Sequence, residues 1–352
     1  MSNKINNSPK KKVNIKYIAE LAGVAPSTVS RALRSHDSTA SPKTIEKIQK
    51  LAKELNYYPD SLAKSLREKK TNTIGIILND LNNPFYTEIL STIGEILNEN
   101  NYSMIVNYSN WDFDRERKNI MTLLSKRVDG IIISPVDDKS ENINILFDNN
   151  VEAVLIDCYP CFKNVSYVYT EHGKGASIAT EYLIKNGHKD ILLFTVPYQF
   201  SLANQFINGY LQILKKYNIE VKEELIVKAD NLSIDSGYET FKKILTENSI
   251  GKNTYFTAVI TISDLLAIGI YKAANELGFD IPGNYSIIGY DNIKVTSALH
   301  PPLTTIHQPR RRIGINSTRI LLNNINSEYK KIIERVAFDP HIVIRGSVRK
   351  IN

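Results

Sequence analysis

The sequence has no hydrophobic run long enough to span a membrane. A membrane helix needs about 18 or more consecutive apolar residues, and no stretch of the 352 residues reaches that length. The first twelve residues are polar and basic and lack the apolar segment of a secretory signal peptide. We therefore expect a cytoplasmic protein with no membrane partner.

Cysteine is scarce, and both copies stand in one short motif, Cys158-Tyr-Pro-Cys161. A pair at this spacing can serve redox chemistry or bind a metal. No second pair of ligands completes a zinc site, and the motif does not begin a helix as thioredoxin-like motifs do. We favour two ordinary thiols at the end of a strand.

Signatures of cofactor use and of catalysis are also missing. No Gly-x-Gly-x-x-Gly or Walker sequence follows a predicted strand, so a nucleotide cofactor is not expected. No residues combine into an activated nucleophile, a metal cluster or an acid and base pair at a diagnostic spacing. The sequence thus predicts no catalytic residue, no metal and no cofactor, which argues against an enzyme.

Basic residues are concentrated at the N-terminal end. Residues 1–70 hold 15 Lys and Arg against 6 Asp and Glu, a net charge of +9, whereas residues 71–352 hold 29 against 31. A basic end of this kind binds polyanions such as nucleic acid. Residues 1–12, rich in Asn and Lys, predict a disordered basic arm. A generic cationic tail is the alternative, but a tail lacks the apolar periodicity that follows.

Residues 13–33 predict two short helices joined by a tight turn. Apolar residues recur at i, i+3, i+4 and i+7 from Ile15 to Ala22. Gly23 supplies the turn, and Pro26 suits the first position of a second helix. The apolar residues of that helix face the first helix: Val29, Ala32 and Leu33.

Three side chains of the second helix then face outward, namely Pro26, Ser27 and Arg31. Short residues at a helix start allow close approach to a major groove, and an arginine one turn later can pair bidentately with guanine. The alternative is a helical hairpin whose outer face is simply solvated.

A third helix is predicted after Ser41-Pro42, which suit the N-cap and the first helical position. Its apolar face, from Ile45 to Leu55, would close a small three-helix core, so that a headpiece spans residues 13–58. Residues 59–71 follow and contain a segment too short to be a stable helix alone in water.

From Thr73 onward strands and helices alternate, which predicts an α/β fold with parallel sheets. The chain is long enough for two or three domains, and 42% hydrophobic residues suit a well-packed core. Strands are expected at 73–78, 104–106, 130–133, 153–156, 191–195, 258–262 and 285–289, and His307 is expected to lie in a further apolar strand. Helices are expected at 84–98, 114–125, 143–149, 175–185, 202–217, 236–245 and 264–277.

Two such series predict two similar lobes with a cleft between them. Ligands bind outside the carboxyl ends of the strands in sheets of this kind. At these ends the sequence has aromatic side chains, carboxylates and amides. That mixture suits a small polar ligand such as a sugar.

The stretch Gly23-Val-Ala-Pro-Ser-Thr-Val-Ser-Arg31 resembles the DNA-binding headpiece of the lactose-repressor/galactose-repressor family of bacterial transcription regulators. The resemblance implies two groups of DNA contacts: base reading by Pro26, Ser27 and Arg31, and phosphate contact by Thr28 and Ser30. One departure is Ala25, where the family often has a serine that caps the recognition helix.

The family also has a hinge helix that orders on operator DNA and pairs with its copy across a dimer. By resemblance this helix lies within residues 59–71. Leu66 would then be the wedge in the minor groove, with Ala63 allowing close helix approach and Arg67 beside it. A plain linker is the alternative.

Further family signatures extend the resemblance over nearly the whole chain, among them Asn82-Asn-Pro-Phe-Tyr86 and Gly289-Tyr-Asp-Asn292. They imply a two-lobed, periplasmic-binding-protein-like core for effector binding and dimerisation over residues 72–346, followed by a tail at 347–352. Five residues would line the effector pocket: Phe85, Tyr86, Asp157, Ser263 and Asp291. Asp291 could instead cap a turn.

We interpret the chain as a sequence-specific DNA-binding regulator, a repressor, that binds a pseudo-palindromic operator as a homodimer. A small metabolite in the cleft, a sugar or sugar derivative, would control its operator affinity. Phe206 stands where sugar-binding relatives usually have an arginine, which argues against a common hexose or purine. The rival interpretations are a two-lobed metabolic enzyme and a solute-binding protein without DNA activity.

Overall fold

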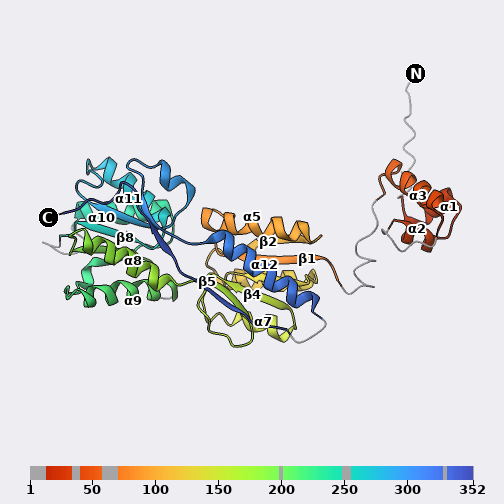
Figure 1. Cartoon of the computed structure of the whole chain (residues 1–352), viewed down its shortest axis with the longest axis horizontal. Coiled ribbons are helices and arrows are strands. Elements are labelled where there is room, and N and C mark those ends of the chain that lie inside the picture. Colours follow the sequence, from red (N-terminus) through yellow and green to blue (C-terminus); the bar gives the residue numbers. More distant parts are fainter. Residues whose placement is uncertain are drawn as a thin grey trace, which may run out of the picture. The chain divides into compact units, whose positions relative to one another are not determined.

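The computed structural model describes residues 13–33, 40–57, 70–197, 201–247, 255–327 and 331–351. It divides into two compact units, Met1–Thr71 and Asn72–Asn352, which we describe separately (Figure 1). The expected arm at 1–12 and the expected hinge residues Ala63, Leu66 and Arg67 lie outside the described residues. Within the described part of the chain, no helix is both long and apolar enough to cross a membrane.

The described residues of the N-terminal unit form three helices: α1 Ile15–Ala22, α2 Pro26–Ala32 and α3 Pro42–Glu54. The side chain of Asn14 accepts a hydrogen bond from the Tyr17 N–H at the start of α1, and Gly23 ends this helix with a φ of 73°. A small apolar core joins the three helices: Ile18, Ala19, Ala22, Val29, Ala32, Ile48 and Ala52. The prediction of a helix-turn-helix closed by a third helix is confirmed.

The first lobe of the core unit is a six-stranded sheet in the order β11-β5-β4-β3-β1-β2, and all its strand pairs are parallel. Its strands are β1 Thr73–Leu78, β2 Ser103–Tyr108, β3 Gly130–Ile133, β4 Glu152–Ile156, β5 Ser166–Thr170 and β11 Arg335–Phe338. Its helices are α5 Pro84–Glu99, α6 Phe113–Ser125, α7 Asn142–Asp148 and α12 Arg310–Asn326. Apolar side chains of α5 and α12 cover one face of the sheet, and those of α6 and α7 cover the other.

The second lobe is a six-stranded sheet in the order β12-β10-β9-β8-β6-β7, in which only the edge strand β12 is antiparallel. Its strands are β6 Ile191–Thr195, β7 Ile226–Lys228, β8 Ala258–Thr261, β9 Ser286–Asp291, β10 Thr304–His307 and β12 His341–Val343. Its helices are α8 His172–Lys185, α9 Ser201–Lys216, α10 Ile234–Glu247 and α11 Asp264–Glu276, with 3-10 turns η1 Glu223–Leu225 and η2 Lys294–Ala298. The predicted α/β fold with two parallel-sheet lobes is confirmed.

The chain passes between the lobes three times: from β5 to α8, from β10 to α12 and from β11 to β12. Helix α12 therefore starts at a strand of the second sheet and packs in the first lobe, against α5 and β4. The sequence prediction missed α12, β5, β7, β11 and β12. Three of these strands are sheet edges of three or four residues, which are too short for a clear apolar pattern.

The expected tail at 347–352 must be corrected over its described part, residues 347–351. Ser347 is fully buried and donates a hydrogen bond to the Ile287 carbonyl at 2.6 Å. The Ile351 N–H donates to the Asn186 carbonyl at 2.9 Å. These contacts use one hydroxyl and backbone groups, so the apolar pattern of the sequence gave no signal of them.

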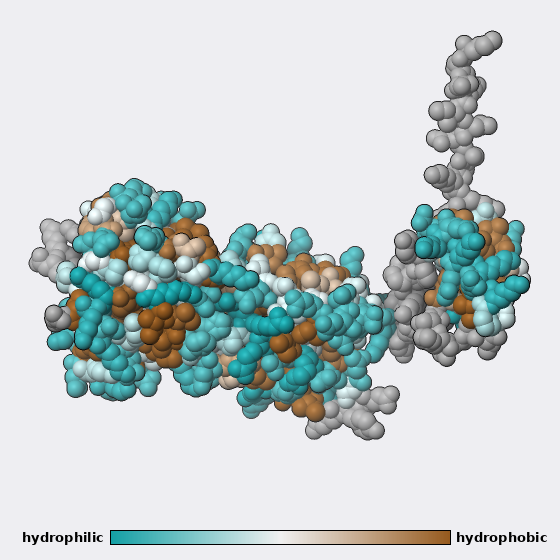
Figure 2. All heavy atoms as spheres, turned by 45° about the horizontal axis from the view of Figure 1, so that its top comes forward, coloured by the Kyte–Doolittle hydropathy of each residue, from teal (hydrophilic) through white to brown (hydrophobic). Residues whose placement is uncertain are grey.

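Apolar side chains fill the interior of both lobes, but several large ones are exposed. Among the most exposed on the core are Ile332 (67%), Tyr255 (65%) and Ile344 (59%). On the face of the molecule that Figure 2 shows, hydrophobic side chains form separate patches among hydrophilic ones. Scattered exposure of this kind is ordinary for a folded surface.

Ala25→Ser should stabilise α2. Helix α2 begins at Ala25 without a side-chain cap, whereas the Ser41 hydroxyl at the start of α3 accepts a hydrogen bond from the Thr44 N–H at 3.3 Å. A serine at position 25 can accept from an N–H of the first turn, which contributes about 1 kcal/mol. Hydrogen exchange of the α2 amide protons should slow about five-fold. Ala25→Val, which adds bulk without an acceptor, is the control, and equal slowing in both variants would contradict the capping explanation.

Candidate functional site

A small cavity lies between the two lobes of the core, where strands of both sheets end. The first lobe contributes Asn83, Phe85, Tyr86, Trp111 and Asp157 to its walls. The second lobe contributes His172, Leu202, Leu232, Ile262, Ser263, Tyr290, Asp291 and Gln308. All five residues expected to line an effector pocket therefore meet here, although their binding role stays a prediction. The volume of about 20 Å³ holds no more than a single water molecule.

Larger spaces adjoin this cavity. One of about 630 Å³ shares Trp111, Leu202 and Leu232 with it and is also lined by Asp80 and Asp230. A groove of about 1180 Å³ runs along α8 and α9 and includes Glu171 and Asp339 from the segments that cross between the lobes. Pockets of small ligands have volumes of about 300–1,000 Å³. The space for a ligand thus lies beside the five residues rather than among them.

A polar network connects the two lobes through the cavity wall. The Tyr86 hydroxyl donates to Oδ2 of Asp157 at 2.9 Å, and His172 Nε2 lies 3.4 Å from Oδ1 of the same carboxylate. His172 Nδ1 shares a hydrogen bond of 2.9 Å with the Tyr290 hydroxyl. Burial, followed by the charge of Asp157, raises the pKa of Tyr86 well above its ordinary value. The phenol therefore keeps its proton and serves as a donor.

Asp291 is the most deeply buried carboxyl of the cavity wall, with 5% of its surface exposed. Gln308 Nε2 donates to its Oδ1 at 2.8 Å, and the Ser263 hydroxyl donates to its Oδ2 at 3.2 Å. Burial raises the pKa of Asp291 to about 7, although the Gln308 bond and the Arg310 charge oppose this. The neighbouring Asp264 also has a raised pKa, because of burial and the charge of Asp291.

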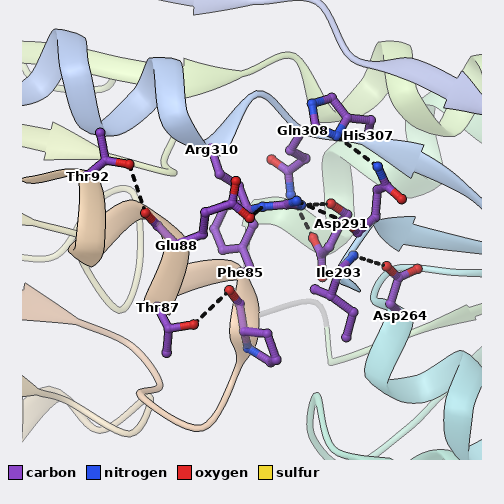
Figure 3. A network of polar contacts seen from close by, with 12 residues as sticks. Phe85, Thr87, Glu88, Thr92, Asp264, Asp291, Ile293, His307, Gln308 and Arg310 are labelled. Carbon is purple, nitrogen blue, oxygen red and sulfur yellow. Dashed lines mark hydrogen bonds and ion pairs between the residues drawn. The ribbon is translucent and has the colours of Figure 1, made fainter. Parts of the chain in front are cut away.

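Arg310 joins the two lobes beside the cavity (Figure 3). It is 4% exposed and is the first residue of α12. Its Nε lies 2.9 Å from Oε2 of Glu88, on α5 of the first lobe. Its two terminal nitrogens donate to the carbonyls of Asp291 and Asn292 in the second lobe. The guanidinium thus fixes the position of one lobe against the other.

Sequence reasoning missed several residues of this region, above all His172, Gln308 and Arg310. Gln308 stands within a family signature that could have indicated it. Arg310 begins a run of three arginines, a pattern typical of a solvated helix face. Phe206, which replaces an expected arginine, is fully buried and packs edge-to-face on Tyr290 with ring centroids 4.7 Å apart. It does not line the cavity.

The two cysteines are not bridged: Cys158 is buried and Cys161 is exposed. Burial, followed by the charge of Asp138, raises the pKa of both thiols, so neither has the character of a reactive thiolate. Among the described residues, no group of three or more His, Cys, Asp or Glu side chains is arranged to hold a metal ion.

The outer face of α2 is available for contact with another molecule. Pro26, Ser27 and Arg31 are exposed, and Thr28 and Ser30 are partly so. Arg31 Nε donates to the Ser27 carbonyl at 3.4 Å, which holds the side chain along the helix. The expectation that these side chains face outward is confirmed, whereas their contacts with DNA stay a prediction.

Comparisons with known proteins cover both units. A family model described as bacterial regulatory proteins, lacI family, matches residues 14–60. A model described as periplasmic binding proteins and sugar binding domain of LacI family matches residues 71–337. The HTH-type transcriptional repressor PurR of Vibrio campbellii is 32% identical over 341 residues, which cover 96% of this chain and 99% of that relative.

Two solved structures are also similar. The lac repressor dimer bound to operator and the anti-inducer ONPF is 27% identical, with a TM-score of 0.82 over 96% of this chain and all of that chain. A LacI family regulator from Enterococcus faecium, solved with bound ribose, is 28% identical, with a TM-score of 0.71 over 80% of this chain and all of that chain.

Arg310→Met should lower the free energy of unfolding of the core by about 3 kcal/mol. The substitution leaves the partly buried carboxylate of Glu88 and two carbonyls without their donor. Arg311→Met is the matched control, because Arg311 and Glu95 are exposed and 3.7 Å apart, and it should change stability by less than about 1 kcal/mol. Urea unfolding of both variants measures the difference. Equal effects would show that Arg310 does not hold the lobes together.

Asp291 should make stability depend on pH. Its pKa is about 7 in the folded chain against an ordinary 3.8. The folded state therefore keeps a proton that the unfolded state releases, and stability falls as pH rises from about 4 to about 7. Asp291→Asn cannot titrate. The stability of wild type relative to this variant should fall by roughly 2–4 kcal/mol across that window, measured by urea unfolding at each pH. If the stability of wild type and of the variant changes with pH in parallel, Asp291 is ionised across the whole window, beside Asp157, Asp264 and Arg310.

Proposed function

This chain belongs to the lacI family of bacterial regulatory proteins, and we propose that it is a repressor whose operator affinity is controlled by a small metabolite in the cleft of the core. The observation that carries the proposal is the match to a transcriptional repressor over 96% of this chain and 99% of the relative. Both the DNA-binding unit and the sensing unit are thus present in one chain.

Operator recognition is assigned to α2. Pro26, Ser27 and Arg31 would read base edges in the major groove, with Thr28 and Ser30 on phosphates. The exposure of the first three side chains supports this role. Two copies of the headpiece would read the halves of a pseudo-palindrome, while Leu66, Ala63 and Arg67 of paired hinge segments contact the minor groove.

The effector is expected to be a sugar or a sugar derivative that contacts Phe85, Tyr86, Asp157, Ser263 and Asp291. Their convergence on one cavity between the lobes supports this assignment, as does the bound ribose of the similar LacI family regulator from Enterococcus faecium. A ligand that changes the lobe arrangement would alter the segment near residue 72 that leads to the headpiece. This coupling cannot exceed the difference in ligand affinity between the two lobe arrangements.

Dimerisation and the absence of catalysis complete the proposal. The lac repressor, similar over 96% of this chain, is a dimer on its operator, and a homodimer is the simplest reader of a two-fold operator. The relatives are transcriptional repressors rather than enzymes. We assign the protein no catalytic function and a cytoplasmic location.

Selection of fragments of the source genome by the purified protein at fixed salt tests the function. Wild type should enrich one pseudo-palindrome. Arg31→Ala should cost roughly 1–3 kcal/mol on that operator and little on random DNA, because a bidentate base contact is lost. Fluorescence anisotropy on both DNAs measures the affinities.

Lys16→Ala is a useful control because Lys16 is also exposed but lies on α1. It should weaken binding to both DNAs about equally if it contacts only phosphate. If Arg31→Ala behaves in this same way, Arg31 reads no base. If neither wild type alone nor wild type with added small-molecule extract enriches any sequence, the regulator proposal is wrong.

A further inference from the structure

Building on the proposed function, we propose that the effector is a small ligand that carries a protonated amine beside its hydroxyl groups, such as an amino sugar. The inference rests on the chemistry of the cavity walls: aspartates line them, and the described lining residues include no lysine or arginine.

Aspartates are the only residues with a carboxyl group, and no lysine or arginine occurs, among the described residues that line the interlobe cavities. Three adjoining cavities share Trp111 and Leu202, two of about 20 Å³ and one of about 630 Å³. Six aspartates line them: Asp80, Asp137, Asp138, Asp157, Asp230 and Asp291. No lysine or arginine is among their lining residues in the described part of the chain. The groove of about 1180 Å³ does have lysines, Lys139 and Lys174, and Lys174 is already paired with Asp339 at 2.6 Å.

Gln308 provides independent evidence that the cavity wall lacks a hydrogen-bond donor. Its side chain is 97% buried, and Oε1 has no hydrogen-bond partner. Its amide nitrogen donates to Oδ1 of Asp291 at 2.8 Å, so the amide oxygen points away from that carboxyl group. The orphaned oxygen belongs to a residue that lines the cavity. A buried acceptor without a donor is costly, and a ligand N–H or O–H satisfies it.

Arg310 does not supply the missing charge. Its guanidinium is used by Glu88 and by the carbonyls of Asp291 and Asn292. Phe206 does not supply a positive charge either: where sugar-binding relatives usually have an arginine, this chain has an aromatic ring. Asp157 accepts from the Tyr86 hydroxyl and lies 3.4 Å from Nε2 of His172, while Asp291 accepts from Ser263 and Gln308.

These contacts discriminate between ligand classes. A phosphorylated sugar would bring negative charge next to Asp157 and Asp291 and would be repelled. A neutral sugar can donate hydroxyl protons but brings no positive charge to Asp157 and Asp291. An ammonium group supplies both donors and charge, and such bonds are roughly twice as strong as neutral ones. Trp111 also lines the adjoining space of about 630 Å³, and its aromatic ring suits the apolar face of a sugar ring.

Calorimetric titration of the full-length protein tests the inference with matched ligands. Glucosamine, galactosamine and mannosamine are each compared with the parent hexose and with the N-acetyl derivative, which has lost the charge. Glucose 6-phosphate represents the anionic class. Trp111, the single tryptophan of the sequence, gives a second readout because it lines the cavities. At least one amino sugar should bind about ten-fold or more tightly than both of its neutral partners.

Variants connect this preference to the site. Asp291→Asn and, independently, Gln308→Met should reduce the preference to about two-fold or less, since each removes an acceptor. The surface substitution Asp148→Asn, at the exposed end of α7, should leave it unchanged. Thermal unfolding confirms that each variant is folded before its affinity is compared.

The inference is overturned if no amino sugar binds, or if a parent hexose, an N-acetyl derivative or the phosphate binds as tightly. Its failure is distinct from failure of the proposed function. If the protein selects an operator but prefers neutral sugars, only the proposal that the effector carries an amine is wrong. If the protein binds an amino sugar but selects no DNA, only the proposal that it is a DNA-binding regulator is wrong.

Discussion

The arrangement of the two lobes depends on one buried cation, the guanidinium of Arg310. Its position at the first turn of α12 is electrostatically unfavourable, because the N-terminus of a helix carries partial positive charge. Glu88 from one lobe and two carbonyls from the other offset that cost. Since removing any partner would strand a buried charge, the lobes are held together by the same contacts that keep the arginine paired.

Asp291 connects the interlobe contacts of Arg310 to the cavity. Its carbonyl accepts from Arg310, while its carboxyl group lines the space between the lobes and accepts from Ser263 and Gln308. A ligand that donates to this carboxyl group therefore acts on the residue that Arg310 holds. Two of the three chain crossings adjoin residues of the cavity wall: the crossing from β5 to α8 directly precedes His172, and the crossing from β10 to α12 contains Gln308. A change in lobe arrangement would therefore move residues that line the cavity.

Much of this organisation could be predicted from local patterns in the sequence. Continuous apolar runs gave the buried parallel strands, and helical periodicity with Gly23 and Pro26 gave the headpiece. Family motifs brought together five cavity residues that are up to about 200 positions apart in the chain. The buried roles of Arg310 and His172 could not be seen, because burial there results from segments that cross between lobes. The packing of residues 347–351 gave no local signal either, because its contacts use one hydroxyl and backbone groups.

The central claim is that occupation of the cleft and binding of DNA are linked. The most direct measurement is the affinity for the selected operator, at fixed salt, with and without a ligand that calorimetry has shown to bind the core. The account predicts that the ligand changes the operator affinity of wild type by about five-fold or more, and that Asp291→Asn loses this response at the same ligand concentration while still binding operator. A ligand that saturates the cleft of wild type and leaves its operator affinity unchanged would contradict the account.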